Sequence, residues 1–151
     1  KKNGTVGCVV LDKQGNLTAG TSTGGMFKKR WGRIGDSPVI GAGTYADNNS
    51  CAVSCTGHGE YFIRHAVAFD VCARYKYLKE SVEKAADYII HTELNTNAGN
   101  GGLIAVDKLG NIAMPYNSGG MFRGFLYKEK GSPEIKKGCG IGKKIVVVGE
   151  K

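Results

Sequence analysis

A threonine between two glycines is the residue whose type and setting best suit covalent chemistry. It lies near one end of the chain, in the run Asn3-Gly4-Thr5-Val6-Gly7. A threonine hydroxyl is a poor nucleophile at neutral pH unless a base lies within hydrogen-bond reach. An N-terminal threonine carries such a base itself, because its own α-amino group has a pKa near ~7.7–8.0. Cleavage of the Gly4–Thr5 peptide bond would therefore give one residue both the nucleophile and the base.

The alternative interpretation of Thr5 is structural, because threonine is common in β-strands and an apolar segment follows it up to Asp12. Gly4 allows the strained backbone that cleavage needs, and Gly7 allows another group to approach closely. A short motif of this kind also occurs by chance. The choice between the two interpretations therefore depends on the other motifs of the chain.

A polar loop over residues 28–38 holds Arg33 and Asp36 next to glycines. One interpretation of the two residues is an ordinary surface ion pair. The other is a clamp for a substrate that carries both a carboxylate and an ammonium group. Arginine binds a carboxylate through two parallel hydrogen bonds, and aspartate accepts hydrogen bonds from an amine. The loop alone leaves both interpretations open.

A glycine-rich turn follows the strand predicted at residues 51–55 and precedes a helix predicted over residues 61–76. The turn has the sequence Thr56-Gly57-His58-Gly59-Glu60. Backbone N–H groups without intrahelical partners point outward where a strand, a glycine-rich turn and a helix N-terminus meet. We therefore expect this turn to bind an anion or an oxyanion.

The elements that position these residues include an internal repeat. Residues 9–17 (VVLDKQGNL) reappear as residues 104–112 (IAVDKLGNI), and both copies run on to a hydroxyl residue followed by Gly-Gly-Met-Phe. Each copy predicts a β-hairpin, because a Gly-Asn turn separates two apolar strands. These strands are apolar at almost every position, so we expect both of their faces to be covered. The second copy has Gly101-Gly102 in place of Val6-Gly7, and we interpret it as structural only.

The rest of the chain supplies short strands and a second helix. This helix is expected to begin after Ser81, a good N-cap, with apolar residues at helical spacing up to Ile90. The remaining strands are expected at residues 39–45, 125–127 and 145–148. A loop and a flexible turn region are expected at residues 95–102 and 128–142. Grouped strands with two consecutive helices predict an α+β layered sandwich. The helices are too few to cover every sheet layer, so we expect a second chain to complete the fold.

Length and charge limit the classes of partner. The chain has 151 residues, which is enough for one domain of ordinary size. Its formal charge of +8 would suit nucleic acid, a membrane surface or anionic substrates. The basic residues are scattered apart from clusters at residues 1–2, 28–30 and in the C-terminal tail, and no recognition helix, zinc finger or aromatic RNA-binding motif accompanies them. We therefore expect a solvated basic face or, alternatively, the basic half of a complex, with no nucleic acid and no membrane as partner.

Cysteine usage indicates the cellular compartment. The chain has five cysteines, an odd number, and no Cys-x-x-Cys, so neither a disulfide framework nor a zinc site is predicted. The three histidines also lack metal-ligand spacing. No secretory signal peptide and no apolar run long enough to span a bilayer is recognisable. We expect reduced thiols and a cytoplasmic location.

Five motifs together resemble the β-subunit of plant-type L-asparaginases, also called isoaspartyl peptidases, which are N-terminal-nucleophile hydrolases. The motifs are residues 4–7 (GTVG), 20–25 (GTSTGG), 32–38 (GRIGDSP), 41–43 (GAG) and 56–60 (TGHGE). They follow the family's order and spacing, and the resemblance covers about residues 4–126. Five motifs in register favour the catalytic interpretation of Thr5.

The resemblance implies the β-subunit half of a four-layer αββα sandwich. Residues 5–151 would form a single catalytic domain, completed by an α-subunit from the same precursor. Residues 1–4 would be a remnant of the linker or an added tag. Two such αβ pairs would associate into an (αβ)2 heterotetramer. Relatives hold a structural sodium ion in the α-subunit, and the resemblance implies no cofactor and no metal for this chain.

The same resemblance implies how the nucleophile arises. Thr5 would be freed when the precursor cuts itself at the Gly4–Thr5 bond, and its amine would then act as general base. Thr23 would hydrogen-bond to the Thr5 hydroxyl and orient it. Asn3 stands where relatives more often have histidine or aspartate, which leaves the speed of cleavage open.

The substrate contacts are implied in the same way. Arg33 would bind the substrate α-carboxylate, and Asp36 would bind its α-ammonium group together with the Gly59 carbonyl. The Thr56 hydroxyl and the Gly57 N–H would form the oxyanion hole. The implied reaction is hydrolysis of the side-chain amide of L-asparagine and of β-aspartyl (isoaspartyl) dipeptides, which releases L-aspartate.

Other functions stay open at this stage. Glycosylasparaginase performs the same chemistry on asparagine-linked sugar, and a taspase-like protease is a more remote alternative. From a different class, the chain would be a catalytically silent interaction module, with Thr5 blocked by the residues that precede it. A chain that begins at Thr5, detected by mass spectrometry, would exclude the silent module.

Overall fold

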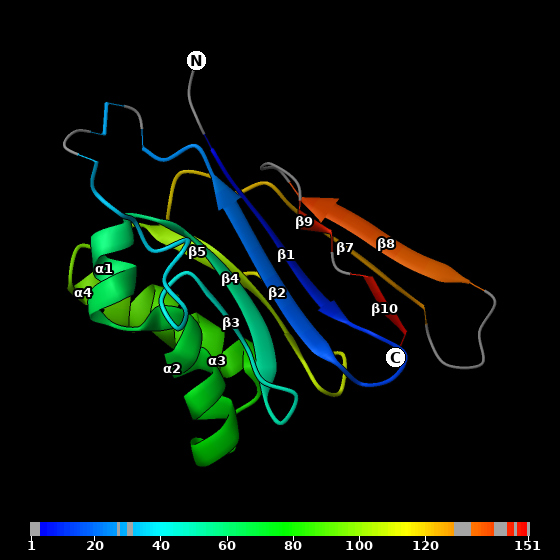
Figure 1. Cartoon of the computed structure of the whole chain (residues 1–151). Helices are drawn as coiled ribbons and strands as arrows, with labels where there is room; N and C mark the ends of the chain where they lie inside the picture. Colours follow the sequence, from blue (N-terminus) through cyan, green and yellow to red (C-terminus); the bar gives the residue numbers. More distant parts are fainter. Residues whose placement is uncertain are drawn as a thin grey trace.

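The computed structural model describes residues 4–26, 28–29, 32–128, 134–140, 145–146 and 148–150. In this part of the chain, consecutive helices cover one face of a sheet, and a second sheet lies against the opposite face (Figure 1). Helices and strands are thus separated into layers, which confirms the mixed α and β architecture. Most of the segment predicted as a linker remnant, residues 1–3, lies outside the described residues.

The sheet next to the helices is antiparallel throughout, with strand order β3-β4-β5-β6. Its strands are β3 (Thr44–Ala46), β4 (Cys51–Gly57), β5 (Gly101–Asp107) and β6 (Ile112–Ala113). Every residue of β5 is buried, because the helices pack on one of its faces and the second sheet packs on the other. The strand predicted at residues 51–55 is confirmed and extends to Gly57.

The second sheet is built on the hairpin of β1 (Thr5–Leu11) and β2 (Leu17–Thr23). The short strand β9 (Ile145–Val146) pairs in parallel with β1. The inner face of this hairpin packs on β4 and β5 through apolar side chains, namely Val9, Leu11, Leu17, Ala52, Ile104 and Val106. The outer face is only partly covered by described residues, since Val6 is 51% exposed. The expectation that both faces are covered is confirmed for β5. For the outer face of β1 it stays a prediction, because the cover expected there belongs to a second chain.

The two turns of the internal repeat have the same hydrogen bonds. In the first copy, Asp12 Oδ1 accepts from the backbone N–H groups of Gln14 and Asn16 at 2.9 and 2.7 Å. In the second copy, Asp107 Oδ1 accepts from the N–H groups of Leu109 and Asn111, each at 2.8 Å. Both predicted hairpins are confirmed, as β1–β2 and β5–β6. The repeat therefore places one hairpin in each sheet.

The helical layer contains a break where one continuous helix was predicted over residues 61–76. The structure has α1 (Gly59–Arg64), α2 (Val67–Ala73) and the π-helix η1 (Arg74–Leu78). Ala66 between α1 and α2 has a φ of 45°, which turns the chain. The turn lets the first N–H groups of α2 bond to another segment, because Ala68 and Phe69 donate to the carbonyls of residues 41–42. Tertiary hydrogen bonds thus override the helical pattern.

The second predicted helix is confirmed with its N-cap. The Ser81 hydroxyl accepts from the N–H of Lys84 at 3.3 Å, and α3 (Val82–Tyr88) continues into the π-helix η2 (Ile89–Glu93). The short helix α4 (Leu94–Thr96) then extends into the segment expected as a loop. In the part of the chain that the structure describes, none of these helices has the length and apolar character needed to cross a membrane.

Two further predictions fail for local reasons. The strand expected at residues 39–45 is mostly turn, because the N–H of Gly43 bonds back to the Asp36 carbonyl and Gly41 has a φ of 92°. Only β3 forms there. The flexible region expected at residues 128–142 holds a hairpin strand, since β8 (Ile135–Gly140) pairs with β7 (Arg123–Lys128). Residues 129–133 and 141–144 lie outside the described residues.

The predicted terminal strand appears as two short pieces. These are β9, already described, and β10 (Val148–Glu150), which pairs in parallel with β7. Residue 147 lies outside the described residues.

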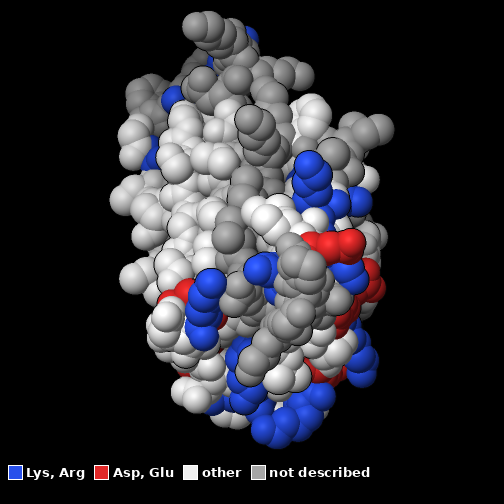
Figure 2. Space-filling model, turned by 90° about the vertical axis from the view of Figure 1, so that its right-hand side faces the viewer, with Lys and Arg blue, Asp and Glu red and all other residues white. Residues whose placement is uncertain are grey.

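On the face shown in Figure 2, lysine and arginine side chains alternate with acidic ones in the lower half, next to a large uncharged area. On this face basic and acidic side chains are thus mixed. Among the described residues, some lysines form ion pairs, such as Lys76 with Asp47 at 3.1 Å.

Candidate active site

The pairing of β1 with β2 brings two threonines together at the open end of the hairpin. Thr5 and Thr23 are direct partners in the register, and the Thr5 hydroxyl donates a hydrogen bond to Thr23 Oγ1 at 3.0 Å. The N–H of Gly25 donates to the same oxygen, also at 3.0 Å. Thr23 is thus held by the turn that follows it, and it in turn fixes the direction of the Thr5 hydroxyl.

A cavity of about 560 Å³ lies beside this threonine pair. It is lined by all eight residues that sequence analysis selected, namely Gly4, Thr5, Thr23, Arg33, Asp36, Thr56, Gly57 and Gly59. They come from the first hairpin, the loop that follows it, the end of β4 and the start of α1. The fold therefore gathers into one space residues that lie up to 55 positions apart in the sequence.

Asp36 is the buried acid of this cavity. Its exposed fraction is 6%, and glycines enclose it: a Cβ at Gly43 or Gly59 would lie 2.8 or 2.7 Å from a carboxylate oxygen of Asp36. Burial raises the pKa of Asp36, and the charge of Lys29 opposes this rise. Among the described residues, Asp36 Oδ2 has no hydrogen-bond partner. A cationic group that entered the cavity would relieve the cost of burying this carboxylate.

Arg33 lies at the more exposed side of the same cavity. Its Nη1 donates to Glu60 Oε2 at 3.2 Å, and the two side chains are 39% and 53% exposed. Glu60 belongs to the first turn of α1. A helix therefore orients an arginine whose own loop, over residues 32–38, forms neither helix nor strand. A guanidinium has five N–H donors, which leaves others to bind a carboxylate.

Thr56 and Gly57 end β4 at the floor of the cavity. Gly57 has a φ of 156°, and a Cβ there would collide with the carbonyl of Asn100. That carbonyl accepts from the N–H of His58 at 2.9 Å. The position therefore requires glycine, and the backbone after it is fixed by the neighbouring strand.

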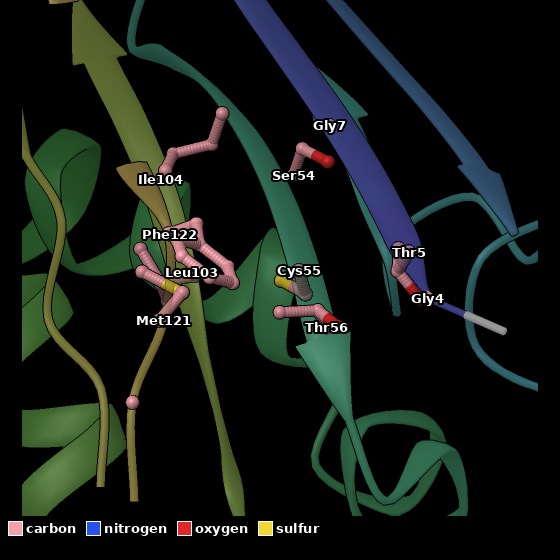
Figure 3. A pocket seen from close by; sticks show the side chains of 11 residues that line it. Gly4, Thr5, Gly7, Ser54, Cys55, Thr56, Leu103, Ile104, Met121 and Phe122 are labelled. Atoms are coloured by element: carbon pink, nitrogen blue, oxygen red, sulfur yellow. The ribbon is translucent and has the colours of Figure 1, made fainter. Parts of the chain in front are cut away.

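A smaller cavity of about 160 Å³ lies on the other side of Thr5. Figure 3 shows Gly4 and Thr5 at one edge, the strand β4 with Thr56 in the middle, and the side chains of Met121 and Phe122 opposite. The second Gly-Gly-Met-Phe run reaches this cavity, whereas the first run lines the larger one. Thr5 is therefore flanked by both copies of the repeat.

Some residues that line the larger cavity were not predicted from the sequence. Lys29 was assigned to a solvated basic face, yet it lines the cavity and affects the pKa of Asp36. Asn100 carries no local signal and reaches the cavity because Gly57 pairs with Gly101. Glu60 is not a lining residue of the cavity, but it pairs with Arg33, which does line it; the sequence marked Glu60 only as part of a motif. Among the described residues, no group of three or more histidine, cysteine or acidic side chains has the arrangement of a metal site.

Comparison with known proteins identifies the family. The family model described as "Asparaginase" matches residues 1–135. This chain belongs to the asparaginase family. The resemblance that the five motifs predicted is thereby confirmed.

Curated relatives of this asparaginase-family chain have similar names. The isoaspartyl peptidase of Salmonella typhimurium is 54% identical over 127 residues, which cover 84% of this chain and 41% of the relative. The isoaspartyl peptidase of Escherichia coli is 49% identical over 141 residues, which cover 87% of this chain and 44% of the relative. A probable isoaspartyl peptidase/L-asparaginase of Arabidopsis thaliana is 53% identical over 120 residues, which cover 80% of this chain and 36% of the relative. The chain thus spans about two fifths of the length of these relatives.

Proposed function

We propose that the protein containing this chain hydrolyses the side-chain amide of L-asparagine and of β-aspartyl dipeptides, with release of L-aspartate. One observation carries the proposal: a hydroxyl oriented by hydrogen bonding, a buried acid and an arginine line the same cavity. An amide with an α-carboxylate and an α-ammonium group matches this set of charges. The names of the relatives, isoaspartyl peptidase and isoaspartyl peptidase/L-asparaginase, support the same substrates.

The proposed nucleophile is Thr5 after cleavage of the Gly4–Thr5 bond. While Gly4 is attached, the nitrogen of Thr5 is an amide and accepts no proton. Cleavage converts it into an amine whose pKa lies near ~7.7–8.0, in the same residue as the hydroxyl. The Thr5 hydroxyl already donates to Thr23 Oγ1, and Thr23 would keep it oriented toward the substrate carbonyl.

Acyl transfer would then proceed in two steps. The Thr5 hydroxyl attacks the side-chain carbonyl while the Thr5 amine takes its proton, and the amine next gives a proton to the leaving ammonia or peptide amine. Water attacks the resulting ester and releases L-aspartate. The Thr56 hydroxyl and the Gly57 N–H would donate to the oxyanion in both steps, and one such donor is typically worth about 3–4 kcal/mol.

Recognition of the aspartyl unit would come from opposite charges at two sides of the cavity. Arg33 would bind the α-carboxylate, and Asp36 would bind the α-ammonium group together with the Gly59 carbonyl. Gly59 fits directly against the Asp36 carboxylate, which supports a shared ammonium site. The substrate cation would also favour the ionised form of Asp36, whose pKa is raised by burial.

We further propose that an α-subunit from the same precursor completes the protein. The exposed Val6 on the outer face of β1 supports this proposal, because a layer on that face would complete the four-layer αββα sandwich. Assembly into (αβ)2 and a structural sodium ion in the α-subunit belong to the same proposal. The buried thiols Cys51, Cys55 and Cys72 fit a cytoplasmic location.

The test uses the full-length precursor. We expect purified protein to contain a chain that begins at Thr5, by intact mass and N-terminal sequencing, and to release aspartate from asparagine and β-aspartyl-leucine. Thr5→Ala should abolish both cleavage and hydrolysis. Thr18→Ala is the matched control, because Thr18 is an exposed threonine on β2. A protein that keeps the Gly4–Thr5 bond and hydrolyses nothing would be an interaction module, and activity on glycosylasparagine alone would indicate a glycosylasparaginase.

A further inference from the structure

Two cysteines meet in the core, away from the candidate active site. Cys51 begins β4 and Cys72 lies near the end of α2. Their Sγ atoms are 2.9 Å apart, and Cys72 Sγ lies 3.3 Å from the carbonyl oxygen of Cys51. Both side chains are almost completely buried, with exposed fractions of 0% and 2%. Two sulfur atoms at this separation need to approach by less than about 1 Å to reach disulfide length.

We propose that Cys51 and Cys72 form a disulfide when the protein meets a peroxide, and that this cross-link ties helix α2 to strand β4. Neither residue lines the two cavities beside Thr5. The proposal is therefore independent of the hydrolytic function and concerns a separate modification site.

The surroundings of the two thiols favour one order of reaction. Hydrogen bonding to Cys72 and burial raise the pKa of Cys51, whereas the hydrogen bond from Cys51 lowers the pKa of Cys72. The thiolate is the reactive form of cysteine, so these shifts favour Cys72 as the residue that reacts with peroxide. The 2.9 Å contact also allows the two residues to exchange roles. Cys51 then supplies the resolving thiol at contact distance.

The oxidation is balanced in two steps. The Cys72 thiolate attacks one oxygen of hydrogen peroxide, the O–O bond breaks, and a sulfenic acid forms. The departing hydroxide takes up the proton that Cys72 had lost and becomes water. Cys51 sulfur then attacks the sulfenic sulfur, the S–O bond breaks, and the departing hydroxide takes the Cys51 proton to form water. Two thiols are oxidised, and one peroxide is reduced to two waters. Hydrogen peroxide is small enough to reach a buried pair during a local opening of α2.

The cross-link joins two elements that support the candidate active site. The first N–H groups of α2 hold the carbonyls of Gly41 and Ala42, in the loop that follows Asp36. The strand that begins at Cys51 ends at Gly57. A disulfide between them restricts the unfolded chain over residues 51–72, which stabilises the folded state. We expect the oxidised protein to melt about 5–10 °C higher than the reduced one.

The experiment treats the full-length protein with increasing hydrogen peroxide, blocks remaining thiols under denaturing conditions and maps the peptides by mass spectrometry. We expect one cross-link, Cys51–Cys72, a higher melting temperature and reversal of both by dithiothreitol. Met26, whose exposed fraction is 43%, measures the oxidation dose through its sulfoxide. The proposal is wrong if Met26 is fully oxidised while both thiols stay reduced, or if other cysteines are the ones that cross-link.

Variants separate the pair from buried thiols in general. Cys55→Ser should still form the cross-link, because Cys55 is an equally buried residue of the same strand that takes no part in it. Cys51→Ser and Cys72→Ser should each lose the cross-link and the rise in melting temperature on oxidation. The wild-type peptide map decides the question even if a serine variant does not fold. If the melting temperature of Cys55→Ser did not rise on oxidation, the assignment of the cross-link to Cys51 and Cys72 would be wrong.

Discussion

Gly7 and Ser54 pack so closely that a Cβ at position 7 would force Ser54 to shift. Gly7 lies on β1 and Ser54 on β4, and the Ser54 hydroxyl occupies the space that a Cβ at Gly7 would need. The Thr21 hydroxyl holds the Ser54 hydroxyl there at 2.6 Å. The two sheets therefore meet through polar groups only two residues away from Thr5. This contact sets the spacing between the strand of the candidate nucleophile and the strand that ends at the candidate oxyanion site.

We expect Gly7→Ala to lower the free energy of unfolding by about 1–3 kcal/mol, the usual cost of overpacking. Ser54→Gly removes the atoms that the new methyl group would meet, so the double variant should be more stable than the sum of the single effects. The coupling should be about 0.5 kcal/mol or more, measured by urea unfolding of the four proteins.

Gly20→Ala is the control for this cycle, because a Cβ at Gly20 on β2 would meet no atom within 4 Å. Its free energy of unfolding should stay within about 0.5 kcal/mol of wild type. Strictly additive effects of Gly7→Ala and Ser54→Gly would show that the two residues do not constrain each other.

The two turns of the repeat allow a comparison within one molecule. Asp107 and Asp12 make the same hydrogen bonds, but Asp107 is 1% exposed whereas the first turn is exposed. The hydrogen bonds that Asp107 accepts are part-buried, so a donor left by Asp107→Ala costs about 1–3 kcal/mol wherever water does not reach it. The donors left by Asp12→Ala are exposed and bond to water. We expect Asp107→Ala to lower the free energy of unfolding by about 1 kcal/mol or more beyond the loss caused by Asp12→Ala. Equal losses in urea unfolding would contradict this explanation.

Local sequence patterns predicted the features that depend on local chemistry. The hairpins follow from the Asp-x-x-Gly-Asn turns, and the cap of α3 follows from Ser81, because in each case a side chain bonds to backbone only a few residues away. The motifs around Thr5, Arg33 and Thr56 likewise selected residues that line one cavity.

The features that sequence analysis missed depend on contacts between distant segments. The helix over residues 61–76 breaks at Ala66 because the N–H groups of α2 bond to the loop after Asp36. Asn100 reaches the cavity only through the pairing of β4 with β5. The pairing of Glu60 with Arg33 also joins segments far apart in sequence. No periodicity or composition within a short window contains this information.

Thr23 offers a test of how the candidate nucleophile is oriented. Thr23→Val removes the oxygen that accepts from the Thr5 hydroxyl, and a single hydrogen bond is worth about 1 kcal/mol or slightly more. We expect kcat for asparagine to fall by roughly tenfold with little change in KM. Thr23→Ser keeps the oxygen and should restore most of the rate.

Thr18→Val is the control for Thr23→Val, because Thr18 is exposed on the same strand and does not line the cavity. We would conclude that Thr23 contacts substrate and does not orient Thr5 if Thr23→Val raised KM and left kcat unchanged.

We expect the ionised Asp36 carboxylate to destabilise the folded protein and to strengthen substrate binding. Burial raises its pKa in the folded state above the value of 3.8 expected for an unperturbed side chain. The folded protein therefore holds this proton more tightly, and stability is lost as the pH rises from the unfolded pKa through the folded pKa. Asp36→Asn removes that loss. We expect the variant to melt at a higher temperature than wild type at pH 7, and the difference to disappear below about pH 3.5, where Asp36 is protonated in both states.

The same variant should bind substrate poorly, because a neutral amide replaces the carboxylate that would accept from the substrate ammonium group. A hydrogen bond to a charged group is worth about 1.5–3 kcal/mol, so kcat/KM for asparagine should fall by roughly 10- to 100-fold. Asp87→Asn is the control, since Asp87 lies on α3 with a side chain that is 68% exposed. Higher stability without loss of kcat/KM would place the ammonium group elsewhere, and loss of both would show that the Asp36 carboxylate stabilises the fold. The expected opposition between stability and binding thus separates a residue that recognises substrate from one that only supports the loop around it.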